Sequence, residues 1–289
     1  MKVGFVAILG RPNVGKSTLL NKILDYEVSI TSEKPQTTRD QIKGIYNDNS
    51  SQIVFIDTPG IHKPQQVLGE RLNEASYSSV KDVDLVLFLT PIDEPIGPGD
   101  KFILEKIANN KNKTAVITKI DVSDPETAKT RALELKEKYG FKDVLGTSVM
   151  MKQSIDSIID YLKEVLPEGM PFYPQEEVTD KSMRFIAKEI IRESAINNVK
   201  HEVPHSIGVL VNEFKEEEKL FRINADIFVE RESQKGILVG REGKMIKTIG
   251  TIAREKMEKS FGVRIVLNLK VKVKKKWTDD ESQIKLMGY

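Results

Sequence analysis

The pattern of apolar and polar positions divides the chain into two parts with different element orders. Over residues 1–166, short apolar runs rich in β-branched residues alternate with longer amphipathic stretches. This alternation of strand and helix patterns is typical of βαβ units around a mostly parallel sheet. The predicted strands are residues 3–9, 53–56, 85–89, 114–117 and 144–145, and the predicted helices are 17–24, 68–81, 100–109, 125–138 and 154–165.

Two connections complete this layout. Residues 41–46 and 52–57 are joined by the turn-rich segment Asn-Asp-Asn-Ser-Ser, which predicts one antiparallel hairpin within the sheet. Three prolines then follow closely in residues 167–174, and proline disfavours helix in the residue before it. We interpret residues 167–180 as a linker.

After residue 180 the predicted order changes to α-β-β-α-α-β. The expected fold is therefore α/β, with a domain around a mostly parallel sheet over residues 1–166, the linker 167–180, and an α+β domain over residues 181–289. The second domain's predicted elements are helix 181–199, strands 206–213 and 220–230, helix 234–239, loop 240–243, helix 244–261 and strand 264–273.

Composition supports two domains and excludes several classes of protein. A chain of 289 residues divides into two domains at about 150 residues each. The longest apolar runs fall far short of the ~18–20 residues that a transmembrane helix needs, and the first ten residues lack a signal-peptide pattern. Because the chain has no cysteine, disulfides, thiolate zinc sites and a cysteine nucleophile are excluded, which fits a reducing cytoplasm.

A phosphate-binding loop is predicted between the first strand and the first helix. The segment matches G-x-x-x-x-G-K-[ST] in full, in the strand–loop–helix context that this motif requires. Its N–H groups would wrap a phosphate, Lys16 would reach the β- and γ-phosphates, and the Ser17 hydroxyl would bind Mg²⁺. The alternative, an ordinary turn with a solvated lysine, is disfavoured by the full match. The candidate residues are Gly10, Arg11, Pro12, Asn13, Val14, Gly15, Lys16, Ser17 and Thr18.

Two later segments are candidates for the metal and the γ-phosphate. Asp57 ends an apolar strand at the sheet edge where α/β proteins bind ligands, and it would hold Mg²⁺ through a water. Gly60 would offer its N–H to the γ-phosphate and act as a hinge. Thr38, in a polar link, would complete the Mg²⁺ shell only with a γ-phosphate present, making that link a nucleotide-sensing loop. An ordinary turn and an ordinary polar loop remain the alternatives.

The segment Thr118-Lys119-Ile120-Asp121 is a candidate for base selection. Asp121 would accept hydrogen bonds from the N1–H and N2–H₂ groups of guanine, a donor pair that adenine lacks, so that an aspartate here selects guanine. The tetrapeptide alone also fits a capped strand end.

The net charge of +2 conceals an uneven distribution. Residues 176–289 hold 23 Lys and Arg against 19 Asp and Glu, and residues 244–276 hold 11 against 2. Such a concentrated basic segment attracts phosphate backbones, although a solvated helix face with a charged edge strand would carry similar charges. The loop Gly240-Arg241-Glu242-Gly243 directly precedes this segment and joins two predicted helices. Its presence favours nucleic-acid binding as the role of the basic segment.

These motifs resemble known families. Residues 1–166 resemble translation-factor-type small GTP-binding domains, and the second part resembles a type II KH domain, whose G-x-x-G loop clamps about four nucleotides. The combination with Arg-Pro-Asn in the P-loop and Gln-Thr-Thr-Arg at 36–39 resembles the Era family over essentially the whole chain. Three departures are Thr118 for the usual Asn, Thr-Ser-Val at 147–149 for a Ser-Ala-Lys-like segment, and Ile61 where Ras-like enzymes place a glutamine.

The resemblance implies further residue roles. Ser148 and Val149 would meet the base, and Asn13 would be a ligand for K⁺, so that slow GTP hydrolysis to GDP would be stimulated by K⁺ or by RNA. Arg241, Lys244 and Lys247 would contact phosphates. The complete RNA-binding candidates are Ile237, Gly240, Arg241, Glu242, Gly243, Lys244, Ile246 and Lys247.

The resemblance also implies partners. The implied partners are the 3′ end of small-subunit ribosomal RNA and the 30S subunit, whose assembly the protein would assist. The protein would be a cytoplasmic monomer that associates peripherally with the inner face of the bacterial membrane. An RNA-binding assembly module with a merely structural nucleotide and an ATP-dependent P-loop enzyme are the alternatives.

Overall fold

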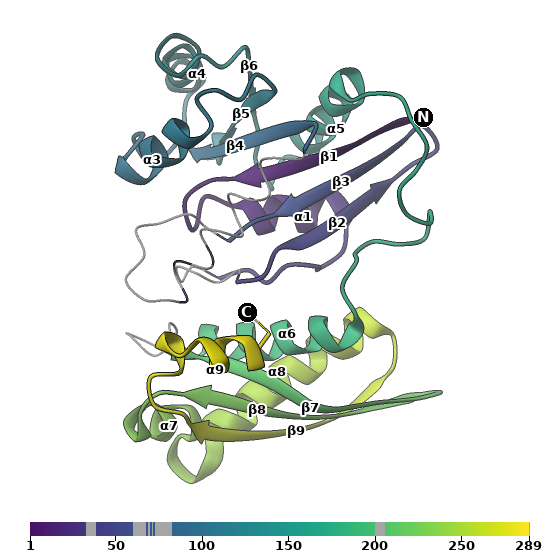
Figure 1. The fold of residues 1–289 in the computed structure, drawn as a ribbon, viewed down its shortest axis with the longest axis vertical. Helices are drawn as coiled ribbons and strands as arrows, with labels where there is room; N and C mark the ends of the chain where they lie inside the picture. Colours follow the sequence, from purple (N-terminus) through teal and green to yellow (C-terminus); the bar gives the residue numbers. More distant parts are fainter. Residues whose placement is uncertain are drawn as a thin grey trace. The chain divides into compact units, whose positions relative to one another are not determined.

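The computed structural model describes residues 1–32, 39–59, 68, 70, 72, 83–199 and 206–288. Within this part the chain forms two compact units, one built mainly from residues up to Asp180 and one mainly from Lys181 onward (Figure 1). This agrees with two domains, while the finer boundary at residue 166 stays a prediction. Among the described residues, no helix combines the length and the apolar character that crossing a bilayer requires.

The first unit is built on a six-stranded sheet with the order β2-β3-β1-β4-β5-β6. All neighbours are parallel except β2, which pairs antiparallel with β3 and confirms the predicted hairpin. β3 and β4 are buried along their whole lengths, as expected for strands covered on both faces. The strands are β1 (Lys2–Leu9), β2 (Ile42–Asn47), β3 (Ser51–Asp57), β4 (Leu85–Pro91), β5 (Lys113–Thr118) and β6 (Asp143–Gly146).

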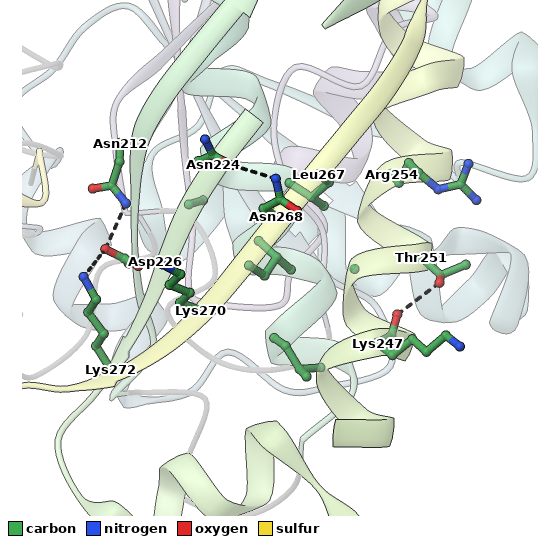
Figure 2. Close-up of a pocket in the computed structure, with 14 residues that line it drawn as sticks. Asn212, Asn224, Asp226, Lys247, Thr251, Arg254, Leu267, Asn268, Lys270 and Lys272 are labelled. Atoms are coloured by element: carbon green, nitrogen blue, oxygen red, sulfur yellow. Dashed lines mark hydrogen bonds and ion pairs between the residues drawn. The ribbon is translucent and has the colours of Figure 1, made fainter. Parts of the chain in front are cut away.

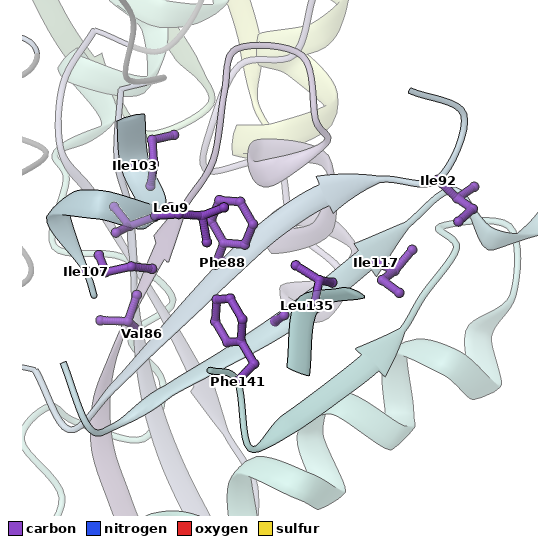
Figure 3. Packing of buried hydrophobic residues seen from close by; sticks show 11 residues of the cluster. Leu9, Val86, Phe88, Ile92, Ile103, Ile107, Ile117, Leu135 and Phe141 are labelled. Carbon is purple, nitrogen blue, oxygen red and sulfur yellow. The ribbon is translucent and has the colours of Figure 1, made fainter. Parts of the chain in front are cut away.

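Helices cover both faces of this sheet. On one face α3 and α4 pack over a core that includes Leu9, Phe88 and Phe141, with the rings of Phe88 and Phe141 stacked at a centroid distance of 5.8 Å (Figure 3). α1 and α5 contact each other on the other face (Figure 1). The described helices are α1 (Lys16–Leu24), α3 (Pro98–Lys106), the short η1 (Ile120–Val122), α4 (Pro125–Tyr139) and α5 (Lys152–Val165).

Element ends differ from the predictions in ways that have local causes. α3 begins at Pro98 rather than residue 100, because Pro98 suits the first helical turn and the Asp100 carboxylate accepts the Gly97 N–H at 3.0 Å. It ends at Lys106 rather than 109. Most of the predicted helix 68–81 lies outside the described residues, where only Leu68, Glu70 and Leu72 are placed, as helix.

The segment 167–180, which the sequence predicts as a linker, is hydrogen-bonded to the first unit. The Ile45 N–H donates to the Val178 carbonyl at 2.8 Å, and the Val3 N–H donates to the Pro167 carbonyl at 2.9 Å. The Gln52 amide oxygen accepts two N–H groups of the segment, those of Phe172 and Tyr173. Ile45 lies in the edge strand β2, whose outer backbone groups need partners, while Val3 and Gln52 lie in the inner strands β1 and β3.

The second unit follows the predicted order α-β-β-α-α-β. Its three-stranded sheet has the order β7-β8-β9, with β8 parallel to β9, and α6 and α8 pack against it. Its elements are α6 (Met183–Asn197), β7 (Gly208–Glu217), β8 (Leu220–Val229), α7 (Glu232–Val239), η3 (Arg241–Gly243), α8 (Lys244–Phe261), β9 (Arg264–Val273), η4 (Trp277–Asp279) and α9 (Glu281–Leu286).

The sequence analysis missed the last two elements of this unit. Trp277 is fully buried and its indole N–H donates to the Ser206 carbonyl at 2.8 Å, while Ile284 of α9 is also fully buried. These tertiary contacts stabilise a helix of six residues that local propensity would not hold.

Candidate functional site

The predicted phosphate loop connects β1 to α1 and leaves the first turn of that helix uncapped by side chains. Gly15 occupies the N-cap position with a φ of 99°, and no side chain caps the helix there. A left-handed φ of this size favours glycine. A helix N-terminus without a side-chain cap is suited to binding an anion, which the helix dipole also favours.

Lys16 is buried inside this loop. Its ammonium donates to the carbonyl oxygens of Gly10 and Arg11 at 3.0 and 2.9 Å, and the residue is 6% exposed. Burial lowers the pKa of Lys16 to about 8, against the opposing attraction of the Asp57 carboxylate. The loop therefore holds the Lys16 ammonium in place, and the ammonium would help the loop to bind phosphate.

Asp57 meets the loop from the end of β3. The hydroxyls of Ser17 and Ser29 both donate to its Oδ2, at 2.7 and 2.8 Å. The carboxylate is completely buried, which raises its pKa against the opposing charge of Lys16 and these hydrogen bonds. Within the described part of the structure its Oδ1 has no hydrogen-bond partner.

These donors fit Mg²⁺. The ion takes hard oxygen ligands, usually one or two carboxylates together with phosphate oxygens and waters. A buried carboxylate with an unpartnered oxygen, next to a serine hydroxyl and a phosphate-binding loop, supplies that set. Ser17 and Asp57 would hold the ion. The third predicted ligand, Thr38, and the predicted γ-phosphate contact, Gly60, lie outside the described residues.

The arginine and asparagine of the loop take different positions. The Arg11 guanidinium forms ion pairs of 2.8 Å with both Glu94 and Asp100, so Arg11 would reach a phosphate only through its backbone. Asn13 lies exposed with a φ of 66°, a left-handed conformation that asparagine tolerates better than most residues. Its predicted role toward K⁺ stays a prediction.

The predicted base-contacting residues converge at the same edge of the sheet. Thr118 ends β5, and its hydroxyl donates to the Val14 carbonyl of the phosphate loop at 2.9 Å, which ties β5 to that loop. Asp121 follows in η1 with an exposed carboxylate that has no recorded partner in the described part of the chain. Lys119 pairs with Asp93 at 3.0 Å. The threonine that replaces the usual asparagine therefore has a structural role here.

The segment after β6 lies beside this group. The Ile120 N–H donates to the Thr147 carbonyl at 3.3 Å, and the Thr147 N–H donates to the Ile117 carbonyl at 2.8 Å. Ser148 is buried, and its N–H donates to the Ser154 hydroxyl at 3.0 Å. The fold thus brings residues 118–121 and 147–149 together, as the nucleotide site requires, and Val149 remains half-buried next to them.

Sequence reasoning missed several residues that support this site. Ser29 donates to Asp57, and it is held in turn by Asn21, whose side chain bonds to the backbone N–H and carbonyl of Ser29 at 3.0 and 2.6 Å. The Thr58 hydroxyl donates to the Ile8 carbonyl at 2.8 Å and fixes the turn after β3. No motif marked Ser29 or Asn21, because these contacts are not periodic in sequence.

The predicted RNA-binding loop joins α7 to α8 in the second unit. Gly240 has φ 71° and ψ 176°, a region open essentially to glycine alone, and Gly243 caps α8 with a φ of 75°. Arg241, Glu242 and Lys244 are exposed on the loop. As at the first site, the helix N-terminus is free of side-chain caps.

A hollow of about 920 Å³ borders β9 and α8 (Figure 2). Of the predicted residues, Ile246 and Lys247 line it, while Ile237 and the G-x-x-G residues do not, and Ile237 is instead exposed. Its lining also includes Arg254, Lys270 and Lys272 of the basic segment 244–276 that the sequence analysis singled out. Further lining residues were not selected from the sequence, and they come from β7, β8, β9 and α8, which only the fold brings together. These are Asn212, Asn224, Asp226, Thr251, Leu267, Asn268 and Leu269.

Polar side chains on this part of the sheet are ordered by one another. The Asn268 amide donates to the Asn224 side-chain oxygen at 2.9 Å, and Asp226 accepts from Asn212 and from the Lys272 ammonium at 2.9 and 2.7 Å (Figure 2). The Lys270 ammonium has no recorded partner in the described part of the chain. The hollow therefore combines fixed amides with available positive charge, which suits a polyanion with base edges.

Comparisons with known proteins identify both units. Residues 5–119 match a family model described as 50S ribosome-binding GTPase, and residues 202–278 match one described as KH domain. GTPase Era of Mycoplasmopsis agalactiae is 53% identical over 289 residues, with 100% of both chains covered. GTPase Era of Clostridium botulinum is 43% identical over 291 residues, covering 100% of this chain and 98% of the other. The chain belongs to the Era family of GTPases.

Solved Era structures share the whole fold. An Era variant of Aquifex aeolicus bound to GDP and AlF₄⁻ is 37% identical and superimposes with a TM-score of 0.96, covering 100% of this chain and 99% of that one. Era in complex with MgGDPNP and nucleotides 1506–1542 of 16S ribosomal RNA is also 37% identical and superimposes with a TM-score of 0.94, with the same coverage of both chains. The predicted family, the P-loop plus KH fold and the GTPase activity are confirmed.

Proposed function

We propose that this Era-family GTPase binds the 3′ end of small-subunit ribosomal RNA through its KH domain and uses GTP binding and hydrolysis to assist 30S subunit assembly. The observation that carries the nucleotide half is the cluster of the buried Lys16 and Asp57 with the half-buried Ser17, at a helix N-terminus without a side-chain cap. The RNA half is supported by the hollow beside α8 and by a relative that was solved with nucleotides of 16S ribosomal RNA.

Each residue of the first site has a role in this proposal. Lys16 and the loop N–H groups bind and orient the phosphates, and Asp121 accepts the guanine N–H groups. Mg²⁺, bound by Ser17 and Asp57, supplies charge stabilisation to the phosphates. Hydrolysis then depends on positioned positive charge, and we propose that it is slow without a stimulating ligand, either K⁺ at Asn13 or RNA.

The decisive test is nucleotide-dependent RNA binding. The dissociation constant of an oligonucleotide from the 16S ribosomal RNA 3′ end should differ between the GTP, GDP and nucleotide-free forms, since ordering of loops by a γ-phosphate gives the two states different contacts. Equal dissociation constants in all three states would contradict the switch. GTP should displace labelled GTP and ATP should not, whereas displacement by ATP would contradict guanine selection.

Single-turnover hydrolysis separates a switch from a structural nucleotide. GTP cleavage should accelerate on addition of the RNA. The unaltered protein should cleave GTP faster in K⁺ than in Na⁺, and the Asn13→Ala variant should cleave it at the same rate in both salts. If GTP is not cleaved under any of these conditions, the result would contradict the switch and favour an RNA-binding assembly module whose nucleotide is structural. A monomer in the cytoplasm with peripheral membrane contact completes the proposal, and sedimentation with and without lipid vesicles tests it.

A further inference from the structure

A basic hollow lies in the first unit, at the end of β5 opposite to the nucleotide site. It has a volume of about 550 Å³ and lies between α3, the connection from α3 to β5, and the end of α4. β5 starts there at Lys113 and reaches the nucleotide edge at Thr118. Six strand residues span roughly 20 Å, so the hollow is separate from the nucleotide site.

Lysine dominates the charged residues around the hollow. Five lysines line it against one carboxylate, Glu105. Three of the five are exposed and form no ion pair in the part of the chain that the structure describes. A fourth is exposed and pairs with the half-buried Glu134 at 3.3 Å, and an ion pair of an exposed lysine contributes little. The five are Lys101, Lys111, Lys113, Lys138 and Lys142.

The fifth lysine removes a local source of negative potential. The Lys113 ammonium donates to the carbonyl oxygens of Ala108 and Ile107 at 3.1 and 3.4 Å, just past the end of α3, and lies 5.2 Å from the centre of the Phe141 ring. Carbonyls at a helix C-terminus repel anions. Since Lys113 satisfies two of them, the exposed lysines around the hollow keep their attraction for an anionic ligand.

The surroundings favour a polyanion over a small anion or a membrane. The free lysines are exposed and come from three segments, whereas a small anion is held by converging buried groups. The lining offers amide donors from Asn109 and Asn110 and the half-buried ring of Tyr139, but no exposed large apolar side chain that would enter a bilayer. These are features of surfaces that contact a sugar–phosphate backbone.

We propose that this hollow is a second RNA-contacting surface, through which the GTPase domain itself binds the phosphate backbone of ribosomal RNA. The proposal rests on the proposed function, in which RNA is the partner, and it extends the contact beyond the KH domain. The RNA region bound here need not be the one held near the G-x-x-G loop, so a long RNA would reach both surfaces and a short 3′ fragment only one.

The test compares two charge-matched double variants of the full chain. Lys101→Glu with Lys142→Glu alters the hollow, whereas Lys22→Glu with Lys129→Glu changes the same amount of charge on exposed lysines elsewhere in the first unit. The probes are full-length 16S ribosomal RNA and the fragment of nucleotides 1506–1542.

The hollow variant should bind full-length RNA at least about tenfold more weakly than the control, with a salt slope smaller by about 1.4 if the contacted RNA is single-stranded. Both variants should bind the fragment alike. Equal affinity of both variants for full-length RNA would overturn the proposal. If the unaltered protein binds neither RNA, the proposed function fails instead.

A second measurement does not depend on variants. Acetylation of Lys111 and Lys142 by an amine-reactive reagent, followed by mass spectrometry, should fall at least about threefold when full-length 16S ribosomal RNA is bound, while Lys22 and Lys129 stay unprotected. Protection by phosphatidylglycerol vesicles but not by RNA would assign the surface to a membrane and overturn the proposal.

Discussion

The two loops of this chain that are predicted to bind phosphate share one local backbone feature. In each, a glycine with positive φ occupies the N-cap position of a helix, Gly15 for α1 and Gly243 for α8, and no side chain caps the helix. Both helix N-termini are therefore suited to binding a phosphate.

The loops differ in where the positive charge lies. Lys16 is 6% exposed and is held by loop carbonyls. The Lys244 side chain is 77% exposed, and among the described residues its ion pair is with the similarly exposed Glu242, at 3.7 Å. A desolvated cation interacts strongly with one well-placed ligand, while an exposed cation acts through displaced counterions and is screened by salt. The comparison teaches that burial, rather than the loop motif, decides between a specific nucleotide site and a polyanion surface.

The largest expected effect is at the buried cation. Lys16→Ala should lower kcat/KM for GTP by about 10² to 10³-fold, because a positioned charge inside a water-excluded site stabilises the transition state. Steady-state hydrolysis and binding of a fluorescent GTP analogue measure it. The affinity of the nucleotide-free variant for RNA should be unchanged. A loss of less than about tenfold in kcat/KM would contradict the conclusion that burial makes Lys16 act more strongly than the exposed cations of the second loop.

The next effect tests how the first site selects its base. Asp121→Asn should weaken GTP binding by about 10²-fold, because the amide oxygen accepts only one of the two guanine N–H groups and the amide N–H₂ then faces a donor. Xanthosine triphosphate, which has an oxygen at position 2, should bind the variant better than GTP does. Competition assays measure both, and unchanged GTP preference would remove Asp121 from the site.

The third effect is on the backbone of the second loop. A Cβ at Gly240 would lie 2.7 Å from the Met245 Cβ and 2.9 Å from its backbone nitrogen, at φ and ψ values that only glycine adopts readily. Gly240→Ala should lower the free energy of unfolding of the second unit by about 2 kcal/mol. Urea unfolding followed by the fluorescence of Trp277, the chain's single tryptophan, measures this unit alone.

Gly243→Asn is the matched control for that experiment. Gly243 has a left-handed conformation that asparagine tolerates, and an added Cβ would meet nothing closer than 4.0 Å. Its cost should be below about 1 kcal/mol. Equal destabilisation by both variants would show that the strain is not specific to Gly240.

The smallest effect is at the exposed cations. Arg241→Ala with Lys244→Ala should weaken binding of a 3′-end oligonucleotide about tenfold and reduce its salt slope by about 1.4, since each charge neutralises one phosphate of a single strand. Lys219→Ala with Lys285→Ala is the control on exposed lysines elsewhere in the second unit. GTP affinity should show little salt dependence by comparison, and a salt-independent RNA affinity would contradict the distinction drawn here.

Local signals predicted some elements closely. α8 was predicted with its observed bounds because Gly243 and Gly262, both with positive φ, bracket an amphipathic run. The P-loop and residues 118–121 were found because each follows an apolar strand, and strand ends in a parallel sheet meet at one edge. α9 was missed because six residues carry too little periodicity, and its stability comes from the burial of Ile284.

The sequence alone determined which loops are candidates for binding phosphate and in what order the elements run, because glycine positions and hydrophobic periodicity are local properties of the chain. Only the tertiary structure decided that Ser29 joins Ser17 on Asp57, that Thr118 holds the P-loop, and that residues 167–180 cover an edge strand. It also decided that Lys16 is buried and Lys244 is not. The physical reason is that desolvation and hydrogen bonding between distant residues depend on packing, which no local pattern encodes.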